Sequence, residues 1–106
     1  MLTSKQRSQL RAMANGIDTI LIVGKDGITP AVAEQAAGAL KARELIKGRV
    51  LETSLLPARE ACELLAERCH AEPVQCIGSK FVLYKRNETD PKIELVKSKK
   101  IKRNGQ

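Results

Sequence analysis

Aromatic residues are nearly missing from this sequence of 106 residues, which has one phenylalanine, one tyrosine and no tryptophan. Protein modules that recognise unpaired bases by stacking carry two or three aromatic side chains on one sheet face. Phe81 and Tyr84 fall on the same predicted strand, where packing within a sheet accounts for both. A nucleic acid bound by this chain would therefore be held through phosphates and shape.

Residues typical of catalytic and metal sites are scarce as well. His70 is the single histidine, and no serine lies in the pattern of a nucleophile elbow. Three cysteines without a C-x-x-C pair indicate neither a disulfide framework nor a zinc site, and they favour a reduced, cytoplasmic location. The longest aliphatic run, Ile20–Val23, has four residues, so no signal peptide or membrane span is expected. We expect no enzyme, no cofactor and no metal.

Acidic residues are outnumbered by basic ones, 12 against 19, which gives a net charge of +7. Five of the cations and no acid fall in residues 97–106, so residues 1–96 carry only +2. The length suffices for one domain, and the charge favours an anionic partner. We expect a domain at 1–97 and a flexible basic tail at 98–106, which serves either as an electrostatic arm on nucleic acid or as a solubilising segment.

Apolar periodicity predicts alternating helices and strands. Thr3 and Gln6 form a capping-box pattern at the start of the first helix, which ends before Asn15-Gly16. Cys62 and Cys69 lie on the apolar stripe of the third helix, where core packing is expected. The expected helices are 3–14, 30–43 and 57–70, and the expected strands are 19–23, 45–51, 74–77 and 81–86, with an extended segment at 92–96.

This order, α-β-α-β-α-β-β, contains two helical crossovers and one hairpin around Gly78-Ser79-Lys80. The economical solution is a two-layer α/β domain. We expect a β-α-β-α-β-β core on a four-stranded mixed sheet with an extra N-terminal helix.

The segment Gly24-Lys25-Asp26-Gly27 connects the first apolar strand to a helix that begins at Thr29-Pro30. Thr29 can cap this helix, and Pro30 suits its first position. We expect free amides of Ala31 and Val32 near the loop, and backbone N–H groups at such a place attract phosphate. G-x-x-G spacing also marks turns that bind nothing.

Further basic residues extend the candidate site. Arg7 and Arg11 lie one turn apart on the first helix, where they either continue a phosphate-binding surface or face solvent. Lys47 and Arg49 make the polar face of the second strand basic. The candidate binding residues are Gly24, Lys25, Asp26, Gly27, Thr29, Arg7, Arg11, Lys47 and Arg49.

Four segments carry a resemblance to a known family. They are T-S-K-Q-R-S-Q-L-R-A-M-A-N, I-L-I-V-G-K-D-G-I-T, E-L-I-K-G-R-V-L and V-Q-C-I-G-S-K-F-V-L-Y-K-R-N, in this order along the chain. The sequence resembles the bacterial YhbY-type members of the chloroplast RNA-splicing and ribosome-maturation (CRM) domain family. The resemblance extends from about residue 2 to residue 96.

The resemblance implies an RNA-binding domain with a core like the C-terminal domain of translation initiation factor 3, preceded by a helix. Single-domain bacterial members are associated with precursors of the large ribosomal subunit, so the implied partners are its RNA precursor and ribosomal assembly particles. The family's G-x-x-G loop matches residues 24–27. Where Asp26 stands, family members often have a neutral or basic residue, and Asp26 either bonds its own backbone or weakens affinity. Cys76 is an apolar replacement in the last motif.

Two other functions remain open on the sequence. The chain can be a protein-interaction module that joins a ribosomal complex through its sheet face or its acidic third helix, with only nonspecific attraction for RNA. A weaker alternative is a small enzyme that holds a phosphate ligand in the glycine loop. Salt dependence of binding to purified RNA separates the interaction module from an RNA-binding protein.

Overall fold

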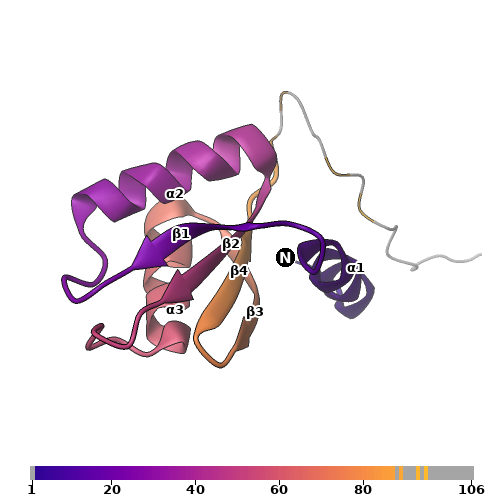
Figure 1. Ribbon diagram of the computed structural model, residues 1–106. Coiled ribbons are helices and arrows are strands. Elements are labelled where there is room, and N and C mark those ends of the chain that lie inside the picture. Colours follow the sequence, from indigo (N-terminus) through magenta and orange to yellow (C-terminus); the bar gives the residue numbers. More distant parts are fainter. Residues whose placement is uncertain (1, 88, 90–92, 94, 96–106) are drawn as a thin grey trace, which may run out of the picture.

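The computed structural model describes residues 2–87, 89, 93 and 95 (Figure 1). Its elements follow one another in the predicted order. They are α1 (Ser4–Ala14), β1 (Thr19–Val23), α2 (Pro30–Arg43), β2 (Leu45–Val50), α3 (Ala58–Cys69), β3 (Glu72–Ile77) and β4 (Lys80–Tyr84). None of the helices in this part of the chain is long and apolar enough to cross a membrane.

Threonine side chains begin the first two helices, as predicted. At α1 the Gln6 backbone N–H donates to Thr3 Oγ1 (3.1 Å), and the Thr3 N–H donates to Gln6 Oε1 (3.0 Å). At α2 the Val32 N–H donates to Thr29 Oγ1 (3.1 Å), and Pro30 occupies the first turn. These bonds satisfy N–H groups that have no partner within the helix, so the local sequence determines where both helices begin.

The strands form one mixed sheet in the order β1-β2-β4-β3. β2 is parallel to β1, and β4 is antiparallel to both β2 and β3. α2 and α3 cover one face of the sheet, and α1 packs against β2, β3 and β4 on the other face (Figure 1). The arrangement confirms the predicted α/β fold with a four-stranded mixed sheet and an extra N-terminal helix.

Each face of the sheet has its own core. The larger core lies under α2 and α3 and contains Phe81, Cys62 and Cys69. The smaller core lies under α1 and contains Tyr84. Phe81 is 1% exposed and Tyr84 is 3% exposed, which confirms that both aromatic side chains serve packing.

Element ends differ from the predicted ones by one or two residues. β3 begins at Glu72 rather than Val74, because it is an edge strand in which Pro73 costs no ladder hydrogen bond. β4 ends at Tyr84 rather than residue 86, because its partner strand begins opposite, at Leu45. β2 ends at Val50, one residue early. α3 lacks the predicted end residues 57 and 70, which flank it as caps.

Glu44 is fully buried, although it is charged, and has a positive φ of 67° at the end of α2. Its Oε2 accepts the Asn87 N–H and its Oε1 accepts the Ile93 N–H, each at 2.7 Å. Ile93 and Leu95 pack against the smaller core. Apart from these two residues, the predicted extended segment 92–96 lies outside the described residues, and so does the predicted tail 98–106.

Candidate nucleic-acid interface

The β1–α2 loop is a tight turn with two charged residues at its tip. The Gly27 N–H donates to the Gly24 carbonyl oxygen at 3.0 Å, and Lys25 and Asp26 between them are exposed. Gly27 has a φ of 70°, a left-handed conformation that glycine adopts without strain. The Asp26 carboxylate has no hydrogen-bond partner within the described part of the chain. Its charge therefore stays at the tip beside Lys25, and the first of the two alternatives, a bond to its own backbone, does not form.

The turn rests against the β2–α3 loop (residues 51–57). A Cβ at Gly24 would lie 3.8 Å from Leu51 Cδ1, and one at Gly27 would lie 3.4 Å from Leu56 Cδ1. Both glycines thus bring the backbone close to leucine side chains of the neighbouring loop. Figure 1 shows the two loops at the same end of the sheet.

The cap of α2 changes which amides the loop can offer. We expected free amides at Ala31 and Val32, but the Val32 N–H is bonded to the Thr29 hydroxyl oxygen. The Ala33 N–H is bonded to the Thr29 carbonyl at 3.0 Å. Thr29 therefore acts first as a helix cap, and the expectation for Val32 is wrong because the predicted cap consumes its donor.

A row of four exposed side chains crosses the sheet next to this loop. The strand register pairs Ile22 with Arg49, Arg49 with Lys80, and Lys80 with Ile77. Residues directly opposite each other share a face, here the face that carries α1. Arg49 and Lys80 are exposed, and Ile22 and Ile77 are 42% and 63% exposed. We call these four residues the cross-strand row.

Lys80 was absent from the sequence-based site, although the hairpin around it was predicted. A hairpin with Gly78 and Ser79 as its turn places Lys80 in β4. Whether it then meets Arg49 depends on the pairing of β4 with β2, which lies far away in sequence. Lys47 stands one position further along the same face and lines a small hollow with Lys80 at the C-terminal end of α1.

Arg7 and Arg11 do not join this surface. Arg7 Nη1 donates to the Pro73 carbonyl at 3.0 Å, which places Arg7 at β3. β3 and β1 are the opposite edges of the sheet, so Arg7 is remote from the loop that follows β1. Arg11 Nη2 donates to Ser8 Oγ at 3.0 Å on its own helix. Figure 1 shows α1 and the β1–α2 loop on opposite sides of the molecule.

The cysteines lie outside the candidate interface. Burial, with smaller contributions from Cys76 and Glu63, raises the pKa of Cys62 to about 12, and burial also raises the pKa of Cys69. Cys76, the apolar replacement in the last family motif, is exposed on β3. The strand alternation places its side chain at the surface beside α3.

At this end of the sheet the described residues expose basic side chains and loop backbone, and both aromatic side chains are buried. Lys25 on the loop and Arg49 and Lys80 on the row can each neutralise a phosphate. The isoleucine side chains that flank the two cations of the row can contact sugars or bases. The surface is therefore suited to an anionic chain held along its backbone.

Comparison with known proteins identifies close relatives. The family model described as CRS1 / YhbY (CRM) domain matches residues 2–85. The chain is 40% identical over 95 residues to the probable RNA-binding protein YqeI of Bacillus subtilis, which covers 90% of this chain and 99% of YqeI. It is 36% identical over 101 residues to a probable RNA-binding protein of Methanocaldococcus jannaschii. This match covers 93% of this chain and 75% of the M. jannaschii protein. The solution structure of the hypothetical protein SAV1595 from Staphylococcus aureus matches with a TM-score of 0.76 at 41% identity, over 91% of this chain and 100% of that one.

Proposed function

The chain belongs to the CRS1 / YhbY (CRM) domain family, and from this membership we propose that it is a non-catalytic RNA-binding protein. The names of its relatives support RNA as the partner. One observation carries the proposal at the level of the site. The exposed glycine turn and the two cations of the cross-strand row lie at the same end of the sheet.

We infer that RNA is held there by its phosphate backbone. Lys25, Arg49 and Lys80 supply positive charge, and the glycine turn that carries Lys25 lies at the same end of the sheet as the other two cations. Both aromatic residues are buried, so stacking on Phe81 or Tyr84 contributes nothing. Affinity should then depend strongly on salt and weakly on base sequence.

We further propose that the target is RNA of the precursor of the large ribosomal subunit, bound in the cytoplasm during assembly. The support is the likeness to single-domain bacterial members of the family. Crosslinking in cells followed by sequencing of the bound RNA tests the target. Recovery of large-subunit precursor RNA is expected, and recovery of only unrelated transcripts would refute this part of the proposal.

Adjacent substitutions at the loop tip test the site. Lys25→Ala should weaken binding to single-stranded RNA by about 1 kcal/mol and reduce the salt slope by about 0.7, because one phosphate contact is lost. Asp26→Asn should strengthen binding, because the unpartnered carboxylate repels phosphate. Fluorescence anisotropy across a series of salt concentrations measures both effects.

Lys41→Ala is the matched control, because Lys41 is exposed in the last turn of α2, away from the loop. It should leave the salt slope unchanged. Equal slopes for the parent and for Lys25→Ala would mean that Lys25 touches no phosphate. If RNA binds weakly and no substitution at this surface changes its affinity, the protein-interaction module is favoured.

A further inference from the structure

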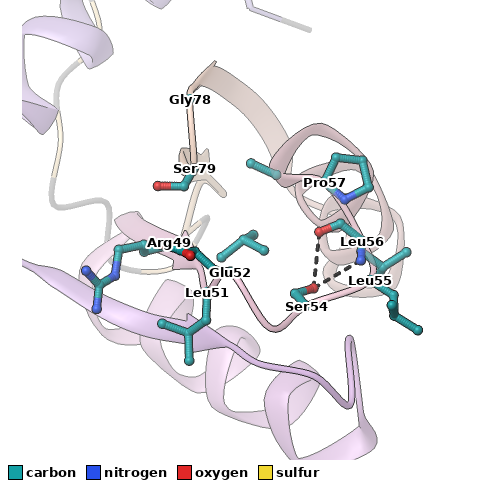
Figure 2. A pocket seen from close by; sticks show the side chains of 11 residues that line it. Arg49, Leu51, Glu52, Ser54, Leu55, Leu56, Pro57, Gly78 and Ser79 are labelled. Carbon is teal, nitrogen blue, oxygen red and sulfur yellow. Dashed lines mark hydrogen bonds between the residues drawn. The ribbon is translucent and has the colours of Figure 1, made fainter.

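A groove lies beside the glycine loop at the same end of the sheet, between the β2–α3 loop and the β3–β4 hairpin. We call it the end groove. It has a volume of about 640 Å³ and is lined by residues within 49–58 together with Gly78 and Ser79. Figure 2 shows Gly78 and Ser79 on one side of it and Leu55, Leu56 and Pro57 on the other. The volume falls within the range of small-molecule binding sites, about 300–1,000 Å³.

The lining of the end groove suits an uncharged ring better than a phosphate. Most of its side chains are aliphatic, from Val50 to Ala58. Its two charged residues, Arg49 and Glu52, have opposite signs and leave no net positive charge. A phosphate gains little in such a site, whereas a nucleobase buries its apolar faces and can bond to polar groups at the rim.

Leu55 at the rim of the groove is 91% exposed. The loop around it is held in place, because the Leu56 N–H and the Leu56 carbonyl are both bonded to the Ser54 hydroxyl at 3.1 Å. Figure 2 shows these two bonds. The side chain of Leu55 is thus displayed to solvent by an ordered turn, and a ligand that enters the groove can cover it.

The opposite wall leaves room for a ligand and offers a polar group. Gly78 has a φ of 59°, and no atom lies within 4 Å of the position of an added Cβ. The Ser79 carbonyl oxygen accepts a hydrogen bond from the Val50 N–H at 2.8 Å. The Ser79 hydroxyl has no hydrogen-bond partner in the described part of the chain and is available to a ligand.

The groove is also continuous with the proposed phosphate site. Leu51 and Leu56 line it, and their side chains are also the nearest atoms to an added Cβ at Gly24 and Gly27 of the glycine turn. Arg49 belongs both to the groove lining and to the cross-strand row. A strand of RNA held at Lys25 and Arg49 would therefore lie next to this groove.

We propose that the end groove receives one unpaired base of the bound RNA, packed against Leu55 and flanked by Arg49. This inference rests on the proposed function, because the phosphates are held by the glycine loop and the row. The proposed contact is made with the base itself. It could not be expected from the sequence, which has too few aromatic residues for a stacking surface. The base is held by aliphatic packing in place of an aromatic ring.

A thermodynamic cycle tests the proposal with the full chain and two probes. The probes are a short oligouridylate and the same ribose-phosphate oligomer without its bases. Leu55→Ser should lower affinity for the oligouridylate by about three- to tenfold, because apolar contact with a base is lost. It should not change affinity for the abasic oligomer, and the salt slope should stay as in the parent because no charge is removed.

Leu64→Ser is the matched control, since Leu64 is a partly exposed leucine of α3 outside the groove lining. It should bind both probes like the parent. Ser79→Leu is a second variant that narrows the groove from the hairpin side without adding an aromatic ring or a charge, and it should reduce the parent's preference for the oligouridylate over the abasic oligomer. Unfolding curves establish that each variant is folded.

Two results would overturn the inference while the proposed function stands. The first is that the parent binds both probes with equal affinity in a salt-dependent manner. The second is that Leu55→Ser lowers the affinity for both probes equally or lowers neither, in which case the groove would be left to a protein partner. By contrast, failure of the parent to bind either probe in a salt-dependent manner would overturn the proposed function itself.

Discussion

At the scale of single residues, Gly48 decides how the sheet packs against α3. It lies in β2 directly opposite Phe81 of β4, with both residues facing the larger core. A Cβ at this position would overlap the Phe81 ring. The largest fully buried side chain of the described residues thus occupies the space that the glycine leaves.

Gly48→Ala should therefore destabilise the protein by about 1–3 kcal/mol through overpacking. Urea unfolding measures the loss. Gly38→Ala is the control: Gly38 is in α2 with nothing within 4 Å of an added Cβ, so this change should stabilise by about 0.5–1 kcal/mol. A Gly48→Ala protein as stable as the parent would mean that the Phe81 ring moves aside without cost.

Cys62 makes stability depend on pH in the alkaline range. Its buried thiol has a pKa raised to about 12, whereas a cysteine in the unfolded chain titrates near 8.5, at about its ordinary value. Between these values the unfolded state loses a proton that the folded state keeps. The free energy of unfolding should consequently fall as pH rises from about 9 towards 12, by about 1.4 kcal/mol per pH unit.

The variant Cys62→Val isolates this contribution, because other groups that titrate above pH 9 are common to both proteins. Its urea midpoint should fall less steeply with pH than that of the parent. Thiol labelling of the native protein at pH 8 provides a check on burial. Cys76 should react quickly, and Cys62 and Cys69 slowly. Fast modification of Cys62 without unfolding would contradict the helix register.

At the scale of elements, Glu44 joins four parts of the fold. It ends α2, precedes β2, and accepts the Lys85 N–H on its carbonyl at 2.9 Å just after β4. Its carboxylate accepts two further backbone N–H groups, from Asn87 and Ile93. Burial, together with this carboxylate, raises the pKa of the neighbouring Tyr84. A buried charge is tolerated here because hydrogen bonds to its oxygens compensate for lost water.

Glu44→Gln should cost about 1–3 kcal/mol, because the amide NH₂ group cannot accept one of the two backbone N–H groups and leaves it unsatisfied. Amide hydrogen exchange at Asn87 and Ile93 should accelerate more than at the centre of β4. Glu34→Gln on the exposed side of α2 serves as the control and should change neither quantity. Unaltered exchange at Asn87 and Ile93 would mean that the carboxylate does not anchor the segment after β4.

At the scale of the whole molecule, charge is divided between the domain and its C-terminal end. Residues 97–106 carry five of the cations, and residues 1–96 have a net charge of only +2. The proposed phosphate site, by contrast, lies within the domain, at the loop and the cross-strand row. We therefore expect residues 97–106 to add long-range attraction for RNA to that of the cations at the proposed site.

Deletion of residues 98–106 should leave the thermal midpoint nearly unchanged, because no residue of the two described cores is removed. Affinity for RNA should fall, more at low salt than at high salt, since four cations are lost. Relative preference among RNA sequences should survive. Calorimetry and competition binding measure these quantities. Complete loss of binding would refute a principal site at the loop and row.

The sequence by itself determined the local features of this protein. Helix starts at Thr3 and Thr29 were predictable because a cap needs only a hydroxyl and an amide a few residues away. The order of helices and strands, and the burial of Cys62 and Cys69, followed from apolar periodicity along the chain. The turn at residues 24–27 followed from the spacing of two glycines. Each of these depends on interactions between neighbours in sequence.

Only the tertiary structure decided which distant residues meet. Strand order placed Lys80 beside Arg49, assigned Arg7 to the opposite edge of the sheet, and allowed Pro73 inside a strand. It also brought Asn87 and Ile93 to the carboxylate of Glu44, and the β2–α3 loop to the hairpin that forms the end groove. The physical reason is that periodicity shows which face of an element is buried, while pairing between distant strands depends on the summed packing of the whole core.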